Sequence, residues 1–73
     1  MSFNKYYIPE PTDLAQSILK NGASAVVNRK IDAIIGNETS IQMFEHAHDM
    51  FSKGEKDSII LKSLVEKFPI YFT

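Results

Sequence analysis

Apolar residues recur every three or four positions through the middle of the chain, and a glycine or a proline follows each run. This spacing is typical of amphipathic helices, and the glycines and the proline mark where each helix stops. The pattern predicts four short helices, at residues 13–20, 24–35, 39–53 and 57–68.

The start of each helix is predicted from residues that can accept a hydrogen bond from free backbone N–H groups. The candidate caps are Thr12 or Asp13, Thr39, and Asp57 or Ser58. Glycine accommodates the left-handed conformation that ends many helices, and proline cannot continue one. The predicted stops are Asn21–Gly22, Gly36, Gly54 and Pro69.

The second helix has a competing interpretation. Ala25–Val27 could begin a strand, because β-branched residues favour strands. Asn28, Arg29 and Lys30 then follow, and they give no alternation of apolar and polar positions to continue a strand. Helix is therefore favoured up to Gly36, on the spacing of Val27, Ile31, Ile34 and Ile35.

Aromatic residues gather at the two ends of the chain. Six of the eight lie in the first seven or the last six positions: Phe3, Tyr6, Tyr7, Phe68, Tyr71 and Phe72. Because aromatic burial is a large energetic contribution, we expect both ends to be held against the core or against another chain. Prolines disfavour helix at the preceding residue, so residues 1–11 and 69–73 are expected to be extended.

These elements predict a mainly α fold in a single domain, residues 1–73. The core, residues 12–68, is expected to be a small antiparallel bundle of three to four short helices. The arm of residues 1–11 and the tail of residues 69–73 could pair as a short two-stranded ribbon or cross the surface of the bundle separately. A lone ribbon is marginally stable, so it would have to pack on the helices.

The small size of the chain favours self-association. A chain of 73 residues hides only about 60% of the surface that its unfolded form exposes. Small scaffolds gain stability from disulfides, metals or partner subunits, and the lack of cysteine excludes disulfides and thiolate metal sites. We therefore expect a homo-oligomer. Aromatic residues recur at the centres of interfaces, so the predicted interface consists of Tyr6, Tyr7, Phe68, Tyr71 and Phe72. A host protein is a second possible partner for this surface.

The charge of the chain argues against nucleic-acid and membrane partners. Eight basic and nine acidic residues give a net charge of −1, so no overall field attracts polyanions. The first residues lack the apolar segment of a signal peptide, and no run of about 18 apolar residues is present. We expect a cytoplasmic protein. Seven lysines against one arginine, with nine isoleucines, fit the AT-rich coding of low-GC bacteria and their phages.

The segment Glu45–Asp49 contains the one cluster of metal-competent side chains. Glu45, His48 and Asp49 share a helix face, but His46 points away from it and provides no H-x-x-x-H spacing. We therefore expect no metal and no cofactor, and a partly buried His48 in the apolar stripe of the third helix. At a helix contact, protonation near the reference pKa of about 6.5 would make His48 a pH-sensitive group.

Lys20, Arg29 and Lys30 form the densest basic patch and are the candidate site for a small anion or a nucleotide phosphate. No glycine-rich loop or aromatic partner accompanies them, so a solvated surface is favoured. A helix-turn-helix over the second and third helices is disfavoured, because Asp32 stands where a small residue belongs and the would-be recognition helix is acidic.

No motif for a catalytic nucleophile is present, since the chain lacks G-x-S-x-G and cysteine. We therefore expect a small non-enzymatic regulatory or inhibitory protein that acts through protein–protein interaction, such as a phage or mobile-element accessory protein. Two alternatives stay open. One is a transcriptional regulator that binds nucleic acid with the second and third helices, and the other is an oligomer that binds a small anionic ligand or nucleotide.

Overall fold

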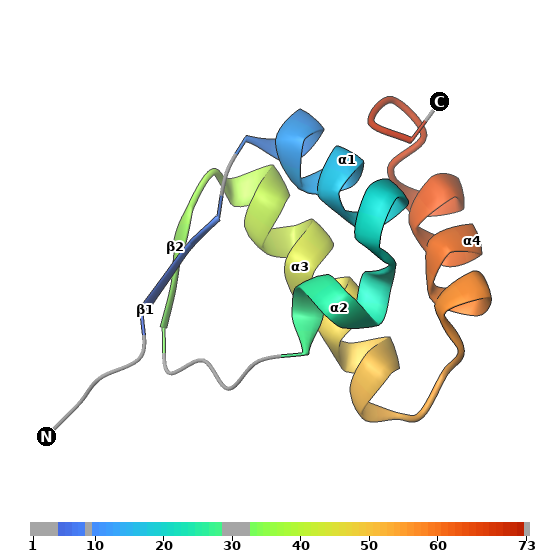
Figure 1. The fold of residues 1–73 in the computed structure, drawn as a ribbon. Helices are drawn as coiled ribbons and strands as arrows, with labels where there is room; N and C mark the ends of the chain where they lie inside the picture. The colour runs from blue at the N-terminus through green and yellow to red at the C-terminus, as the bar shows by residue number, and fades with distance from the viewer. Residues whose placement is uncertain (1–4, 9, 29–32, 73) are drawn as a thin grey trace, which may run out of the picture.

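The structure, a computed structural model, describes residues 5–8, 10–28 and 33–72. This part of the chain forms helices and a two-stranded sheet, and the ribbon drawing shows the sheet beside the helices (Figure 1). In chain order the elements are β1 (Lys5–Ile8), α1 (Pro11–Asn21), α2 (Ala23–Val27), β2 (Ala33–Gly36), α3 (Glu38–Ser52) and α4 (Asp57–Lys67). The prediction of a mainly helical fold is confirmed, and the antiparallel order of the bundle stays a prediction.

The C-terminal end of α3 is a Schellman motif, the glycine-ended stop in which two N–H groups return to the last turn. Gly54 has a φ of 83°, and its N–H donates to the carbonyl of Phe51 at 3.0 Å. The N–H of Glu55 donates to the carbonyl of Met50 at 3.1 Å. The predicted stop at Gly54 is confirmed.

The predicted start of α4 at Asp57 is confirmed, the other predicted starts are late by one or two residues, and the predicted N-cap residues are wrong. The side chain of Asn37, not of Thr39, caps α3, because its oxygen accepts a hydrogen bond of 2.8 Å from the N–H of Thr39. α1 begins at Pro11, where a missing N–H costs nothing, and neither α1 nor α4 has a side-chain cap hydrogen bond at its N-cap residue. The residues predicted as caps of these two helices, Thr12, Asp13, Asp57 and Ser58, lie within their first turns.

Residues 33–36 form a strand, so the predicted helix over residues 24–35 is wrong in its last part. α2 ends at Val27, and residues 29–32 lie outside the described part of the chain. β2 pairs with β1 in parallel register, from Lys5 opposite Ala33 to Ile8 opposite Gly36. A short apolar run fits a helix or a strand equally well by periodicity. Pairing with β1 decides in favour of the strand, because β1 satisfies the backbone of the extended segment while Ile34 packs against the core.

The parallel pairing depends on a crossover and on a glycine. Parallel strands need a connection of a dozen or more residues, and α1 and α2 lie within the connection between β1 and β2. At the end of the ladder, a Cβ on Gly36 would lie 2.7 Å from the backbone oxygen of Ile8. Gly36 therefore permits the close approach of the two strands.

The C-terminal tail does not form the predicted ribbon with the N-terminal arm. Residues 69–71 form a turn, in which the N–H of Tyr71 donates to the carbonyl of Phe68 at 3.1 Å. The turn brings Phe72 back into the core, where its side chain is buried. The predicted extended tail and its pairing with the arm are both wrong, because burial of Phe72 requires the chain to reverse after Pro69.

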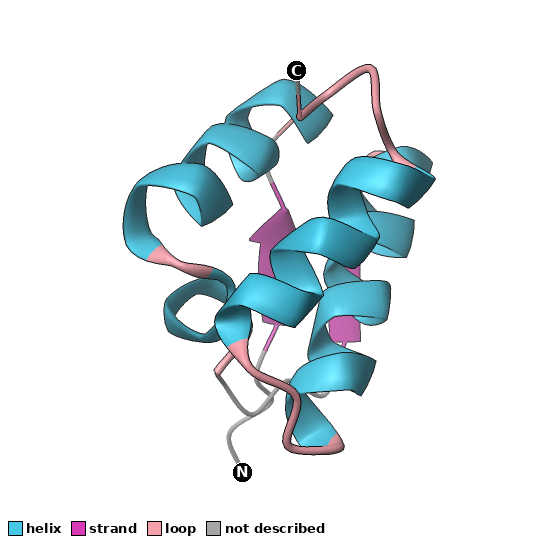
Figure 2. Ribbon diagram, turned by 90° about the vertical axis from the view of Figure 1, so that its right-hand side faces the viewer, coloured by secondary structure: helices cyan, strands magenta, loops and turns pink. Residues whose placement is uncertain are grey.

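The core lies between the helices and the inner face of the sheet. α3 contacts the other three helices and β2. Figure 2 shows the helices in front of the two strands. The buried apolar residues are Ile8, Leu14, Ala15, Ile18, Ala23, Val26, Val27, Met43, Phe44, Ala47, Ile60, Leu64 and Phe72. Within the described ranges, no helix has both the length and the apolar character needed to cross a bilayer.

Candidate interaction surface

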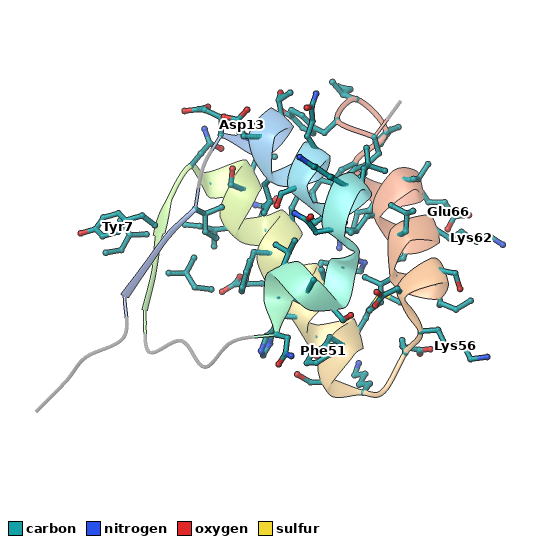
Figure 3. The ribbon with its side chains drawn as sticks, viewed as in Figure 1. Tyr7, Asp13, Phe51, Lys56, Lys62 and Glu66 are labelled. Carbon is teal, nitrogen blue, oxygen red and sulfur yellow. The ribbon has the colours of Figure 1, made fainter. Side chains whose placement is uncertain are left out.

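The outer face of the β1–β2 ribbon carries two exposed apolar side chains at paired positions. Side chains alternate between the two faces of a strand, and Ile8 is buried in the core while Tyr7 is 68% exposed. Tyr7 lies opposite Ile35 in the parallel register, and Ile35 is 38% exposed. Figure 3 shows Tyr7 pointing away from the helices. An aromatic and an aliphatic side chain therefore lie next to each other at the surface.

The ribbon has two open edges. The sheet contains only β1 and β2 among the residues that the structure describes. A strand at the edge of a sheet presents unpaired N–H and C=O groups, which can pair with another strand. The ribbon thus combines an apolar face with backbone groups that are available for hydrogen bonding.

The predicted interface residues do not gather in one place. Tyr7 is on the ribbon, and the C-terminal turn lies on another side of the helices (Figure 1). Phe68 and Tyr71 are half-buried against the core, and Phe72 is buried within it. The backbone of Tyr6 pairs with Ile34, and its side chain lies outside the description. The C-terminal aromatics therefore contribute mainly to packing, and among the members whose side chains are described Tyr7 is the most exposed.

Sequence reasoning missed Ile35 as a surface residue, because it placed this residue on the apolar side of a helix. The signal that could have found it is the pair of β-branched residues Ile34–Ile35, directly before a glycine. Read as a strand, this pair places one side chain toward the core and the other outward. Ile34 is in fact half-buried against the core, whereas Ile35 is exposed.

His48 is half-buried, and its ring stacks on Phe44 with a centroid distance of 6.1 Å and an interplanar angle of 13°. This position agrees with the expected place of His48 in the apolar stripe of α3. The proposed role of His48 as a pH-sensitive group stays a prediction.

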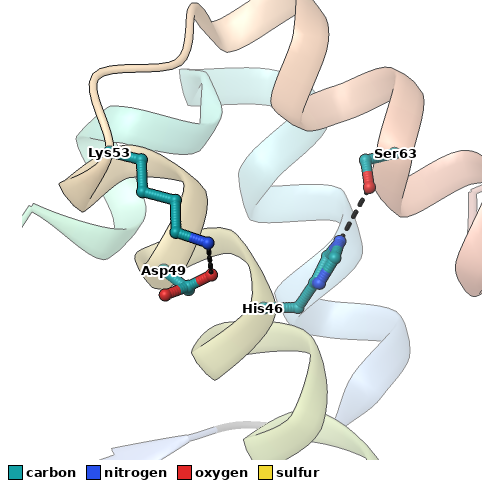
Figure 4. Close-up of polar contacts among 4 residues, drawn as sticks. All are labelled: His46, Asp49, Lys53 and Ser63. Carbon is teal, nitrogen blue, oxygen red and sulfur yellow. Dashed lines mark hydrogen bonds and ion pairs between the residues drawn. The ribbon is translucent and has the colours of Figure 1, made fainter.

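His46 joins α3 to α4 and was missed by sequence reasoning. Its Nε2 shares a hydrogen bond of 2.7 Å with Oγ of Ser63, and its ring meets Phe68 edge-on (Figure 4). Burial at this contact lowers the pKa of His46 from 6.5, and the positive charge of Lys67 lowers it further, while Asp49 acts to raise it. The signal that could have found His46 is its position three residues after the buried Met43.

The 2.7 Å distance between His46 and Ser63 is the one feature that this pair shares with a catalytic base beside a hydroxyl nucleophile. Catalytic pairs of this kind need a third group that orients the base. Among the described residues no carboxylate hydrogen-bonds the other ring nitrogen of His46, and the nearby Asp49 pairs with Lys53 at 3.1 Å on the surface (Figure 4). We therefore interpret the pair as a contact that holds α3 against α4.

The structure describes only Lys20 of the basic patch, and among the described residues it brings no set of metal ligands together. Lys20 lies exposed in the last turn of α1, whereas Arg29 and Lys30 fall outside the described residues. No group of three described His, Asp or Glu side chains could hold a metal ion. The anion site at Lys20, Arg29 and Lys30 stays a prediction.

Asp57 makes a second contact that the sequence did not indicate. Its carboxylate accepts hydrogen bonds from the backbone N–H of Ser24 at 3.2 Å and from its hydroxyl at 3.0 Å. The first residue of α4 thereby caps α2 from across the molecule. Gly22 makes room for this contact, because a Cβ there would lie 3.0 Å from the Asp57 carboxylate.

Comparison with family models, with curated proteins and with solved structures gives no match for this chain.

Proposed function

We propose that this chain is a small non-enzymatic protein that acts through protein–protein interaction, as a homo-oligomer, and that it regulates or inhibits the protein it binds. The observation that carries the proposal is the β1–β2 ribbon, with Tyr7 and Ile35 exposed side by side and both edges unpaired among the described residues.

The energetics of the ribbon support an interaction role. Isolated two-stranded ribbons are marginally stable in water, and at least three strands or packing on helices are needed. Here the helices cover one face, through Ile8 and Ile34, and leave Tyr7 and Ile35 to solvent. Burial of an aromatic side chain at an interface stabilises a complex strongly, and tyrosine is enriched among the residues that dominate binding energy.

The experiment is sedimentation equilibrium of the purified chain over a range of concentrations, with Gly36→Ala as the test variant and Gly54→Ala as the control. A Cβ on Gly36 collides with Ile8 and opens the ribbon, whereas a Cβ on Gly54 meets nothing within 4 Å. We expect the wild type and Gly54→Ala to associate and Gly36→Ala to be monomeric.

The regulatory part of the proposal needs a second measurement. Wild type and both variants are immobilised and exposed to a lysate of the source organism or its host, and captured proteins are identified by mass spectrometry. We expect a protein that binds the wild type and Gly54→Ala but not Gly36→Ala. A wild type that is monomeric at all concentrations and captures nothing would exclude the proposed function.

A further inference from the structure

The two edges of the ribbon differ in how well they are protected against pairing with another strand. Proteins block edge strands with lysine and proline. β1 contains Lys5 and is followed in the sequence by Pro9, which has no N–H to donate. β2 has the sequence Ala-Ile-Ile-Gly, without charge or proline. Its outer edge is therefore the one that is open to pairing.

We propose that β2 pairs antiparallel with β2 of a second copy of the chain, so that two ribbons join into one four-stranded sheet of order β1-β2-β2-β1. This inference rests on the proposed function, and it names the partner and the strand that the self-association uses. The arrangement is a two-fold symmetric interface, in which the same strand of each copy meets its equivalent.

The lack of charged side chains in β2 favours a second copy of the chain as the partner at this edge. Like charges directly opposite one another destabilise a strand pair. In a two-fold antiparallel pairing, one residue of β2, either Ile34 or Ile35, lies opposite its own equivalent. β2 contains no charged residue, so the pairing places no like charges of the two strands opposite one another. The same pairing of β1 would place a lysine, Lys5, on each edge strand, and lysine on an edge strand opposes pairing.

The size of the edge sets the strength of the dimer. Four residues span roughly 13 Å at about 3.3 Å per residue. A standard stable interface buries about 800 Å² on each partner, which is more than such a short edge provides. We therefore expect a weak dimer, with a dissociation constant in the micromolar range or higher. In the joined sheet, two Tyr7 and two Ile35 side chains lie on one continuous outer face.

The test compares Ile35→Lys on β2 with Tyr7→Lys on β1. Both residues are exposed on the same face of the ribbon, so neither change removes a core side chain. The dimer dissociation constant is measured by sedimentation equilibrium between roughly 10 μM and 1 mM, a range that suits a weak interface. We expect Ile35→Lys to raise the dissociation constant by about tenfold or more, because lysine on an edge strand opposes pairing. Tyr7→Lys should change the dissociation constant much less.

Amide hydrogen exchange provides a second measurement that does not depend on a substitution. Within Ala33–Gly36, some N–H groups point away from β1 and have no partner strand in the same copy. Pairing with β2 of a second copy would protect these N–H groups from exchange with solvent. Exchange of these amides should therefore slow as the wild-type concentration rises through the dissociation constant, while exchange in Lys5–Ile8 stays constant.

Each other outcome overturns the inference and identifies what replaces it. Equal weakening by both lysine variants would indicate that the ribbon faces pack together, and weakening by Tyr7→Lys alone would indicate the edge of β1. A dimer that Gly36→Ala abolishes and Ile35→Lys leaves intact contradicts the β2 pairing while the proposed function survives. A wild type that stays monomeric to 1 mM removes both the inference and the proposed self-association.

Discussion

Replacement of Gly36 by alanine tests the parallel ribbon directly. The new Cβ would lie 2.7 Å from the backbone oxygen of Ile8 and 3.3 Å from its backbone nitrogen. Both of these atoms belong to the backbone, so no side-chain rotation can relieve the overlap. Ile8 is also held in place by the core, where its side chain is buried.

The loss of unfolding free energy in Gly36→Ala cannot exceed that of the least unfavourable rearrangement that relieves the overlap. An overpacked site costs about 1–3 kcal/mol, and a strained backbone conformation costs a similar amount. Release of β1 from β2 avoids both costs but exposes Ile8, whose burial is worth roughly 1.5–3 kcal/mol. We therefore expect Gly36→Ala to reduce the free energy of unfolding by about 2–3 kcal/mol and to open the ribbon while the helices stay folded.

Gly54→Ala is the matched control, because Gly54 is also exposed and also has a positive φ, 83°. A Cβ there meets no atom within 4 Å. Its cost is the left-handed backbone alone, about 1–2 kcal/mol. The ribbon should keep its pairing in this variant.

The assays are urea unfolding for stability and amide hydrogen exchange for the ribbon. Amides of Lys5–Ile8 and Ala33–Gly36 that are protected in the wild type should exchange freely in Gly36→Ala and normally in Gly54→Ala. Unchanged protection in Gly36→Ala would refute the register that places Ile8 opposite Gly36.

Three further predictions concern the helices. Because the pKa of His46 is lowered in the folded state, the unfolded chain binds more protons than the folded one as the pH falls below about 6.5. The stability that neutral His46 contributes is complete above about pH 6.5 and is lost as the pH falls through the folded pKa. Urea unfolding at pH 7.5 and 5.0 should therefore show a smaller loss of unfolding free energy in His46→Gln than in the wild type, and an equal loss would contradict this. Asp57→Ala removes both hydrogen bonds to Ser24 and should lower the free energy of unfolding by about 0.5–2 kcal/mol at this exposed site. Ser24→Ala keeps the bond from the backbone N–H to Asp57 and should lower it less. Equal losses in urea unfolding would show that the backbone bond contributes nothing. Phe44→Ala in the core should lower the free energy of unfolding by about 3–5 kcal/mol, against a total of about 4–11 kcal/mol for a chain of this length. Leu19→Ala, at a residue that is 49% exposed, should lower it far less. Equal shifts of the thermal unfolding midpoint in the two variants would contradict the assigned core.

The long helices could be predicted because their signals are local. The buried side of α3 appears in the sequence as apolar residues three and four positions apart, and Gly54 marks its end through a conformation that glycine favours. Pro69 likewise limits α4. Each of these signals lies within a few residues of the feature that it specifies, so no knowledge of the rest of the fold is needed.

The ribbon could not be predicted because its cause is distant in sequence. Ala33–Gly36 is too short to distinguish helix from strand by period, and its partner β1 lies 28 positions earlier in the register. The C-terminal aromatics were misplaced for the same reason. Burial of Phe72 depends on the surface that the helices present, and nothing in residues 69–73 indicates where that surface is.

The candidate site was anticipated only through Tyr7. An aromatic residue in an extended arm indicated a contact surface, but the companion of Tyr7 is Ile35, which follows from the register and not from the terminal aromatics. The Ser24–Asp57 and His46–Ser63 contacts join residues 33 and 17 positions apart, and polar pairs over such separations leave no local pattern.

The parallel pairing of β1 with β2 also determines the order in which the molecule can assemble. β1 leaves the ribosome before its partner strand has been synthesised, and α1 and α2 must fold back before the two strands can meet. Contacts between distant segments form late, because closing the intervening loop costs entropy. The newly made N-terminal strand therefore stays unpaired until Gly36 has emerged, and during that interval it is available to bind a chaperone or a neighbouring nascent chain.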